Sequence, residues 1–264
     1  MISTLNSGDE ILSIEGDEIA QKKSSVIDVT DVQFAWNCVA SPVLNIKKFT
    51  VEPGEKIFVE GPSGCGKSTL ISLLAGVSNS TTGSVSILGQ NLNHMKGAER
   101  DAFRADHTGV IFQMFNLLSY LSVIENVTLP CMFSNHRKQK VLETAENLEH
   151  EAIRILTRLE MGDSAVLNRP VAELSVGQQQ RAAAARALIG QPEIIIADEP
   201  TSSLDSANRE TFIKLLFEEC ERNKSSLIFA SHDISLAPLF DRVLSFDQIN
   251  RTDESSGSKV REDS

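Results

Sequence analysis

The chain has 264 residues and is acidic, with 25 lysines and arginines against 36 aspartates and glutamates and a formal net charge of −11. An acidic chain is a poor candidate for binding the phosphate backbone of DNA or RNA, so we expect no nucleic-acid partner. Its scattered cysteines form no C-x-x-C pair, which argues against a zinc ribbon and a disulfide scaffold. No apolar run reaches about 18 residues, so any membrane-spanning part would have to come from another polypeptide.

Both ends of the chain are polar. Residues 1–24 are acidic with few aromatic side chains, and residues 250–264 are charged and rich in serine. Segments of this composition cannot bury enough apolar surface to offset the entropy of ordering, so we expect a disordered extension and a disordered tail. The first residues also lack the basic start and apolar run of a signal peptide. Residues 25–249 are then expected to form the folded domain.

Strand-like and helix-like patterns alternate through this domain. Residues 56–60, 193–198 and 226–231 are short apolar runs of the kind found in buried parallel strands. Residues 68–76 have helical spacing and end in a glycine. This alternation predicts an α/β fold built around a parallel sheet.

The middle of the chain has a different pattern. From about 138 to 161, apolar residues recur with a helical period of about 3.6. A helix-rich insertion is therefore expected in the parallel α/β core. We place this helical subdomain at about 114–180.

The strongest motif is the segment GPSGCGKST, which fits the pattern G-x-x-x-x-G-K-[ST] between a predicted strand and a predicted helix. Glycines let backbone N–H groups approach phosphate oxygens, and the following helix points its positive end at the anion. Lys67 is expected to reach the β- and γ-phosphates of a nucleotide, and the Ser68 hydroxyl to bind Mg²⁺. The predicted loop residues are Gly61, Pro62, Ser63, Gly64, Cys65, Gly66, Lys67, Ser68 and Thr69.

A second motif, IIIADEP, places Asp198 and Glu199 at the end of an apolar run. In open α/β sheets, ligands bind at the carboxyl ends of the strands. Asp198 is then placed to hold Mg²⁺, directly or through water, and Glu199 to orient and polarise an attacking water. Taken alone, the motif would fit a solvated acidic turn, but its position downstream of a phosphate loop favours the catalytic interpretation.

The segment ELSVGQQQRAAAARAL predicts a second helix N-terminus. Ser175 and Gln178 have the S-x-x-Q spacing of a capping box, and an alanine-rich helix former follows. Ser175 and the backbone N–H of Gly177 would form another anion-binding device. Because one ATP needs only one phosphate loop, this device suggests a second molecule, although an ordinary capped surface helix fits the segment equally well.

Together these motifs resemble those of the ATP-binding cassette (ABC) ATPases over roughly residues 26–249. LSVGQ resembles the family signature LSGGQ, with Val176 where glycine is usual, and VQFAW places Trp36 where the family has an aromatic ring against adenine. GVIFQ places Gln113 at the family's Q-loop, where its amide would touch Mg²⁺ and the attacking water.

Two further family segments follow in the expected order. SSLD places Asp205 in the D-loop, which contacts the opposite subunit, and SHD places His232 at the H-loop, near the γ-phosphate. The other histidines lack such placement and are expected at the surface: His94, His107, His136 and His150.

The resemblance implies a P-loop (RecA-like) fold with an antiparallel β edge, ATP and Mg²⁺ as ligands, and ATP hydrolysis. It implies catalytic roles for Glu199, His232 and Gln113, and metal contacts from Ser68, Gln113 and Asp198. It also implies a dimer, expected to be a homodimer, in which each ATP lies between the phosphate loop of one chain and the Ser175–Gln178 segment of the other. Within one chain, these two parts should lie far apart.

The segment FQMFNLLSYLSVIENVTLP resembles one subgroup, the ATPases of lipoprotein-releasing, macrolide-export and FtsX-like permease systems. Ser122 stands where that subgroup has threonine. The resemblance implies a separate membrane permease as partner, a cytoplasmic location on the inner face of the cell membrane, and ATP-driven movement of the permease's external parts. An ATPase of a small-solute importer and a soluble, non-transport ABC ATPase remain the alternatives.

The same segment offers a candidate contact with the permease. Its apolar residues either line the groove that receives the permease's cytoplasmic helix or pack the core of the helical subdomain, and both interpretations stay open. These residues are Leu117, Leu118, Val123 and Val127.

Overall fold

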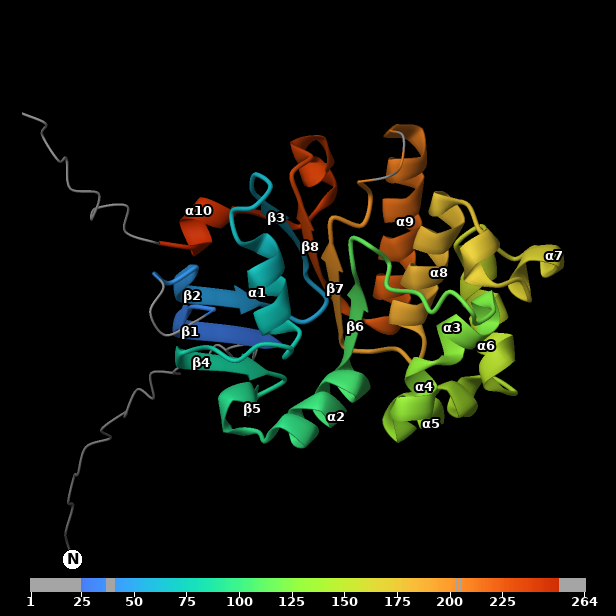
Figure 1. The fold of residues 1–264 in the computed structure, drawn as a ribbon, viewed down its shortest axis with the longest axis horizontal. Helices are drawn as coiled ribbons and strands as arrows, with labels where there is room; N and C mark the ends of the chain where they lie inside the picture. Colours follow the sequence, from blue (N-terminus) through green and yellow to red (C-terminus); the bar gives the residue numbers. More distant parts are fainter. Residues whose placement is uncertain (1–24, 37–40, 203, 205, 252–264) are drawn as a thin grey trace, which may run out of the picture.

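The computed structural model describes residues 25–36, 41–202, 204 and 206–251 (Figure 1). The acidic extension at 1–24 lies outside these residues, as does the D-loop residue Asp205. Of the charged tail, only Asn250 and Arg251 are described.

A five-stranded parallel sheet forms the centre of the fold. Its order is β6 (Thr108–Ile111), β7 (Ile194–Asp198), β8 (Ser226–Ser231), β3 (Lys56–Glu60) and β9 (Arg242–Ser245). The predicted apolar runs are β3, β7 and β8, so these strand predictions are confirmed. Because the strands are parallel, the segments that follow β3, β6, β7 and β8 all leave from the same edge of the sheet.

An antiparallel sheet stands beside the parallel one, which confirms the expected antiparallel edge (Figure 1). Its order is β2 (Leu44–Val51), β1 (Ile27–Phe34), β4 (Thr82–Ile87) and β5 (Gln90–Asn91). Asn250 forms an isolated bridge with Ile46 of β2, and its side-chain amide donates to the Val43 carbonyl at 3.0 Å. These contacts fasten the end of the described chain to this sheet.

The buried strands separate two hydrophobic clusters. Every residue of β7 is buried, and alternate side chains point to opposite faces of the sheet. Ile194 and Ile196 pack in the cluster that contains α1 (Lys67–Leu74) and the antiparallel sheet, whereas Ile195 packs with the helices on the other face. The covered faces explain why the strand is a continuous apolar run rather than an alternating one.

The remaining helices lie on both faces of the parallel sheet and include those of the inserted subdomain. In chain order they are α2 (Gly97–His107), α3 (Val123–Thr128), α4 (Pro130–Phe133), α5 (Asn135–Thr144), α6 (Leu148–Arg158), α7 (Ser164–Leu167), α8 (Val176–Leu188), α9 (Ser206–Asn223) and α10 (Phe246–Ile249). Short 3₁₀ turns lie at Leu92–His94, Val171–Glu173 and Ile234–Leu239. Among the described residues, no helix combines the length and the hydrophobicity needed to cross a membrane.

The periodic run from about 138 to 161 divides into two helices. Ala145 is extended (φ −130°, ψ 152°), and the Asn147 side chain caps α6 by accepting a hydrogen bond from the His150 N–H at 2.8 Å. Leu142 on α5 is 49% exposed, whereas Leu156 on α6 is fully buried. The apolar period therefore describes the buried face of α6 and not that of α5.

Two of the four apolar residues considered for the permease groove belong to the core of the helical subdomain. Val123 and Val127 are fully buried in its hydrophobic cluster, and Leu117 packs against that cluster. The hypothesis that Val123 and Val127 line a permease groove is therefore wrong, because no surface of either side chain is left for a partner. They hold α3 in the subdomain instead.

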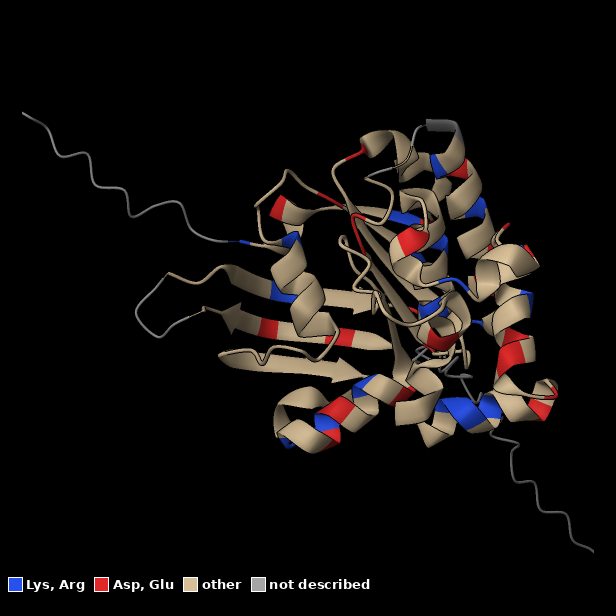
Figure 2. Ribbon diagram, turned by 45° about the vertical axis from the view of Figure 1, so that its right-hand side comes forward, with Lys and Arg blue, Asp and Glu red and all other residues tan. Residues whose placement is uncertain are grey.

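Charged residues of both signs are interleaved along the helices (Figure 2). On α2, Arg104 pairs with Asp101 at 2.7 Å, and on α6, Arg154 pairs with Glu151 at 2.8 Å. Arg154 also reaches Glu219 of α9 at 3.0 Å, and this glutamate is fully buried. The ion pair between Arg154 and Glu219 therefore joins the inserted subdomain to the core of the domain.

Candidate functional site

The glycine-rich loop connects β3 to α1 and curls around its own lysine. Gly64 and Gly66 have φ of 82° and 115°, which favour glycine, and a Cβ at Gly66 would lie 3.0 Å from the Phe246 ring. Lys67, the first residue of α1, donates from Nζ to the Gly61 carbonyl at 2.6 Å and to the Pro62 carbonyl at 3.0 Å. The first turn of α1 contains no acidic residue, so the positive end of the helix faces the loop without a neutralising charge.

Glu199 is held beside this lysine by three neighbours. Its Oε1 lies 3.3 Å from Lys67 Nζ, and its Oε2 lies 2.8 Å from His232 Nδ1 and accepts a hydrogen bond from Ser231 Oγ at 3.3 Å. The Glu199 backbone has a left-handed φ of 46°, and its N–H donates to the Ala230 carbonyl of β8 at 2.9 Å. The carboxyl end of β8 thus holds in place the carboxylate that follows β7.

Asp198 supplies a second buried carboxylate with spare bonding capacity. Burial raises the pKa of Asp198, and the charge of Glu199 acts in the same direction, whereas a hydrogen bond from Ser68 and the charge of Lys67 oppose the rise. Its Oδ1 is buried and has no hydrogen-bond partner within the described part of the chain. A buried carboxylate oxygen without a partner suits a hard cation next to the Ser68 hydroxyl.

These groups surround one pocket of about 280 Å³. Its lining comes from the loop after β3 and the first turn of α1, from the segment after β6, from the end of β7 and the residue that follows it, and from the turn after β8. The lining residues are Ser63, Gly64, Gly66, Lys67, Ser68, Thr69, Gln113, Asp198, Glu199 and His232. The structure therefore brings together the predicted phosphate, metal and catalytic side chains of a single chain.

The other predicted site residues lie around this pocket or away from it. Trp36 is 65% exposed, with its ring edge-on to Phe34 at 5.0 Å, so it is neither a core residue nor part of the pocket wall. Gly61, Pro62 and Cys65 belong to the loop but do not line the pocket. Their roles toward a nucleotide stay predictions.

The predicted second helix N-terminus is present at α8. Ser175 Oγ accepts from the Gln178 N–H at 3.3 Å, and Gln178 Oε1 accepts from the Ser175 N–H at 3.0 Å, so the capping box is confirmed. Ser175 is exposed, and none of Ser175, Gly177 and Gln178 lines the pocket. Figure 1 shows α8 well away from α1, with β8 and β7 between them in the view. One chain therefore does not bring the two anion-binding devices together.

The structure adds a residue that the sequence analysis missed. Arg186 on α8 donates to the carbonyls of Phe115 and Asn116, both at 2.6 Å, and both of these residues have a left-handed backbone (φ 58° and 50°). They lie just after Gln113, so Arg186 holds the loop that carries this glutamine. About 70 residues separate the partners, and no local pattern could have revealed the contact.

Comparison with known proteins agrees with this site. The family model described as ABC transporter matches residues 44–202. The lipoprotein-releasing system ATP-binding protein LolD of Psychrobacter arcticus is 38% identical over 223 residues, which cover 84% of this chain and 95% of that protein. The macrolide export ATP-binding/permease protein MacB of a Shewanella strain is 37% identical over 202 residues, which cover 76% of this chain and 30% of that longer protein.

Solved structures agree as well. The dimeric post-hydrolysis state of the ATP-binding cassette MJ0796, bound to ADP and Pi, matches with a TM-score of 0.72 and 30% identity over 83% of this chain and 93% of that one. These findings confirm the P-loop fold and the resemblance to the lipoprotein-release and macrolide-export ATPases. The chain belongs to the ABC transporter family and is an ATP-binding, ATP-hydrolysing member of it.

Proposed function

We propose that two copies of this chain close on ATP and thereby drive a separate membrane permease of the lipoprotein-release or macrolide-export type. The observation that carries the proposal is the division of the site: Lys67, Asp198 and Glu199 share one pocket, while the capped N-terminus of α8 lies outside it. The likeness to LolD over nearly the whole of that relative supports the choice of permease class.

Each pocket would hold ATP through the loop after β3. The phosphates would replace the Gly61 and Pro62 carbonyls as partners of Lys67, and Trp36 would stack on the base. Ser68, Asp198 and Gln113 fit a Mg²⁺ ion, because Asp198 offers a buried oxygen that has no other described partner. Bound there, the ion would neutralise phosphate charge.

Hydrolysis would depend on Glu199. His232 and Ser231 hold one oxygen of its carboxylate, which leaves the group oriented at the pocket wall, where it can accept a proton from an attacking water. His232 would also contact the γ-phosphate, and Gln113 would position the water.

The second chain would complete the site. Ser175 is exposed, Gly177 and Gln178 are half-buried, and these groups lie at the N-terminus of a helix, where backbone N–H groups favour anions. A head-to-tail pair would place this segment of one copy over the phosphates held by the other. The dimeric form of MJ0796 supports such a pair. Asp205 would contribute to the same contact, although it lies outside the described residues.

The permease would dock beside the loop that carries Gln113. Four large apolar side chains are 70–80% exposed there, on this loop and on α4, and they replace the buried valines as candidates for the permease surface. They are Met114, Tyr120, Met132 and Phe133. Contact at this surface would place the protein on the cytoplasmic face of the cell membrane.

The test is capture from detergent-solubilised membranes with tagged Glu199→Gln protein and Mg-ATP, followed by mass spectrometry. A permease with few membrane helices and a large external domain is expected. A Met132→Ser/Phe133→Ser form should lose the permease but keep its ATP-dependent dimer, whereas a Leu142→Ser control should keep both. A many-helix permease with a solute-binding protein would indicate an importer, and the lack of a membrane partner would indicate a soluble ATPase.

A further inference from the structure

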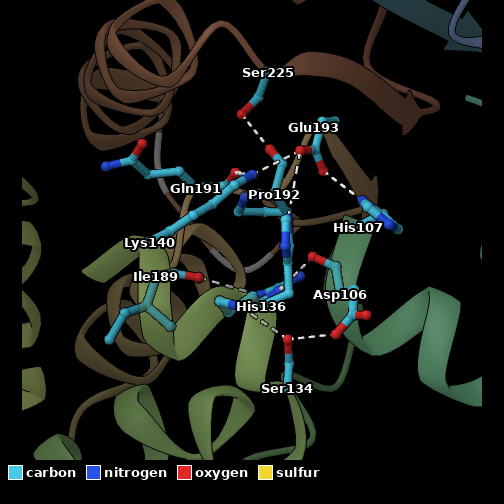
Figure 3. A network of polar contacts seen from close by, with 11 residues as sticks. Asp106, His107, Ser134, His136, Lys140, Ile189, Gln191, Pro192, Glu193 and Ser225 are labelled. Atoms are coloured by element: carbon cyan, nitrogen blue, oxygen red, sulfur yellow. Dashed lines mark hydrogen bonds and ion pairs between the residues drawn. The ribbon is translucent and has the colours of Figure 1, made fainter. Parts of the chain in front are cut away.

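A polar cluster (Figure 3) lies at the amino ends of β6 and β7, opposite the ends that lead to Gln113, Asp198 and Glu199. His107 is the last residue of α2, directly before β6, and Glu193 directly precedes β7. His136 lies on α5, in the inserted subdomain. His107 and His136 were expected at the surface; the structure brings both of them beside one carboxylate.

The distances are those of a compact group. His107 Nδ1 lies 2.9 Å from Glu193 Oε2, and His136 Nε2 lies 3.9 Å from Glu193 Oε1. One ligand atom from each of the three residues lies within 4.8 Å of the others. The two imidazole rings are 5.2 Å apart between centroids.

His136 provides an independent sign that the cluster lacks a component. Its Nε2 is buried and has no hydrogen-bond partner among the described residues. A buried polar atom without a hydrogen-bond partner destabilises the fold, and such an atom usually binds a water molecule or a metal ion. This nitrogen faces the Glu193 carboxylate, so an ion placed between them would satisfy both groups.

We propose that His107, His136 and Glu193 form a second metal site, for a divalent transition ion of the zinc class. Two imidazole nitrogens with one carboxylate, and a position left for water, are a ligand set that zinc accepts, whereas Mg²⁺ and Ca²⁺ prefer oxygen ligands. The site is therefore chemically distinct from the Asp198 site in the nucleotide pocket.

Lys140 is the competitor for this carboxylate. Its Nζ lies 2.6 Å from Glu193 Oε1 and also donates to the Gln191 carbonyl at 3.1 Å. An incoming ion would displace the ammonium from Glu193, and the lysine would keep Gln191 as its partner. The nearby Arg137 is committed to other acceptors, the carbonyls of Ala187 and Ile189 at 3.4 and 3.2 Å.

An ion at this site would join three separate parts of the fold. It would tie α5 to the start of β7 and to the end of α2. The inserted subdomain would then be fastened to the core at the amino ends of the strands. Binding would stabilise the folded chain by RT ln(1 + c/Kd), where c is the concentration of free ion, so the stabilisation would rise with that concentration.

The test uses the full chain, stripped of metal with a chelator, and Co²⁺ as a spectroscopic probe in excess Mg²⁺. We expect one Co²⁺ per chain with visible bands of a nitrogen- and oxygen-bound ion, displacement by Zn²⁺, and a zinc-dependent rise in melting temperature. His136→Ala should weaken binding by about 100-fold, because a direct ligand matters at least as much as the outer groups that support one. His150→Ala is the matched control, since that histidine is exposed and pairs only with Glu146 among the described residues.

Glu193→Gln provides a second variant if His136→Ala melts early, and it should weaken binding to a similar extent. The proposal is overturned if wild type binds no Co²⁺ under these conditions, or if both variants bind it as well as the His150→Ala control. A strong sulfur-to-cobalt band would also overturn it, because it would place the ion on a cysteine. None of these readouts depends on ATP hydrolysis, so they are separable from failure of the proposed transport function.

Discussion

Strands β6 and β7 connect two polar sites of opposite character. At their carboxyl ends lie Gln113 and the Asp198–Glu199 pair, which line one pocket together with the predicted phosphate loop. At their amino ends lie His107 and Glu193, 86 residues apart, joined by His136 and Lys140 from the inserted subdomain. The residues of the nucleotide pocket fall in short contiguous motifs that can be recognised in the sequence. The residues of a junction between two parts of a fold are far apart in the chain and form no such motif.

The largest effect should come from Glu199→Gln at the carboxyl ends. The amide keeps the size of the side chain but cannot accept the proton, so we expect ATP turnover to fall by about 100-fold or more and an ATP-bound dimer to accumulate. Phosphate release and size-exclusion chromatography with and without Mg-ATP measure the two effects. Glu146→Gln is the control, because this glutamate is exposed and lies in the inserted subdomain, outside the pocket. Turnover at the wild-type rate would remove Glu199 from the mechanism.

The second effect concerns Cys65, which lies half-buried inside the phosphate loop. A Cβ at Gly61 would come within 2.8 Å of its Sγ, so the thiol packs closely against the loop backbone and a bulky adduct on it would distort the loop. A maleimide reagent should therefore abolish most ATP binding, and ATP should protect. Cys131 and Cys220 are buried, and burial raises their pKa to about 11 and about 12, so they should react slowly.

Labelling and nucleotide binding would be measured in a Cys38→Ser background, because Cys38 lies outside the described residues. Cys65→Ser in the same background is the decisive control. If the reagent abolishes ATP binding by this double variant as fast as by the Cys38→Ser parent, modification of Cys65 is not the cause of the loss or of the protection by ATP.

A smaller effect is expected from Arg186, which acts on the nucleotide site only through the loop after Gln113. Removal of its two hydrogen bonds to Phe115 and Asn116 should free that strained loop. We expect Arg186→Ala to lower kcat about tenfold, equivalent to about 1.4 kcal/mol, while the affinity for ATP stays unchanged. Phosphate release and titration with a fluorescent ATP analogue separate the two quantities.

Arg222→Ala, on an exposed arginine of α9, is the matched control for Arg186. An equal loss in both variants, or a loss of affinity rather than of kcat, would mean that Arg186 merely supports the fold.

These contacts indicate how far the sequence can predict the molecule. The phosphate loop, the β3 and β8 boundaries and the Ser175 cap were predictable, because each depends on residues within one short segment. The subdomain was predicted less well, since Val123 and Val127 have the same apolar character whether they face a partner or a core. Their burial depends on how α3 packs against α6 and α8, which no local pattern contains.

The smallest effect should appear at the amino ends, as a change of stability with pH. The Glu193 pKa is lowered to about 2 in the folded chain, from an ordinary value of 4.5. Below pH 4.5 the unfolded chain therefore takes up a proton that the folded chain does not, and the stabilisation present above this pH is progressively lost down to about pH 2. The side chain is 33% exposed, so solvent screening should limit the effect to about 1 kcal/mol.

Urea unfolding of wild type and Glu193→Gln at pH 5 and pH 3, with a chelator present, measures this contribution. Other carboxyl groups titrate in both proteins, so the difference between their losses of stability belongs to Glu193. Glu143→Gln, on an exposed position of α5, should behave as wild type. Parallel losses in wild type and Glu193→Gln would show that His107 and Lys140 do not hold this carboxylate. The junction at the amino ends would then depend on apolar packing and on other hydrogen bonds, such as those of Arg137 and that of Ser134 with Asp106.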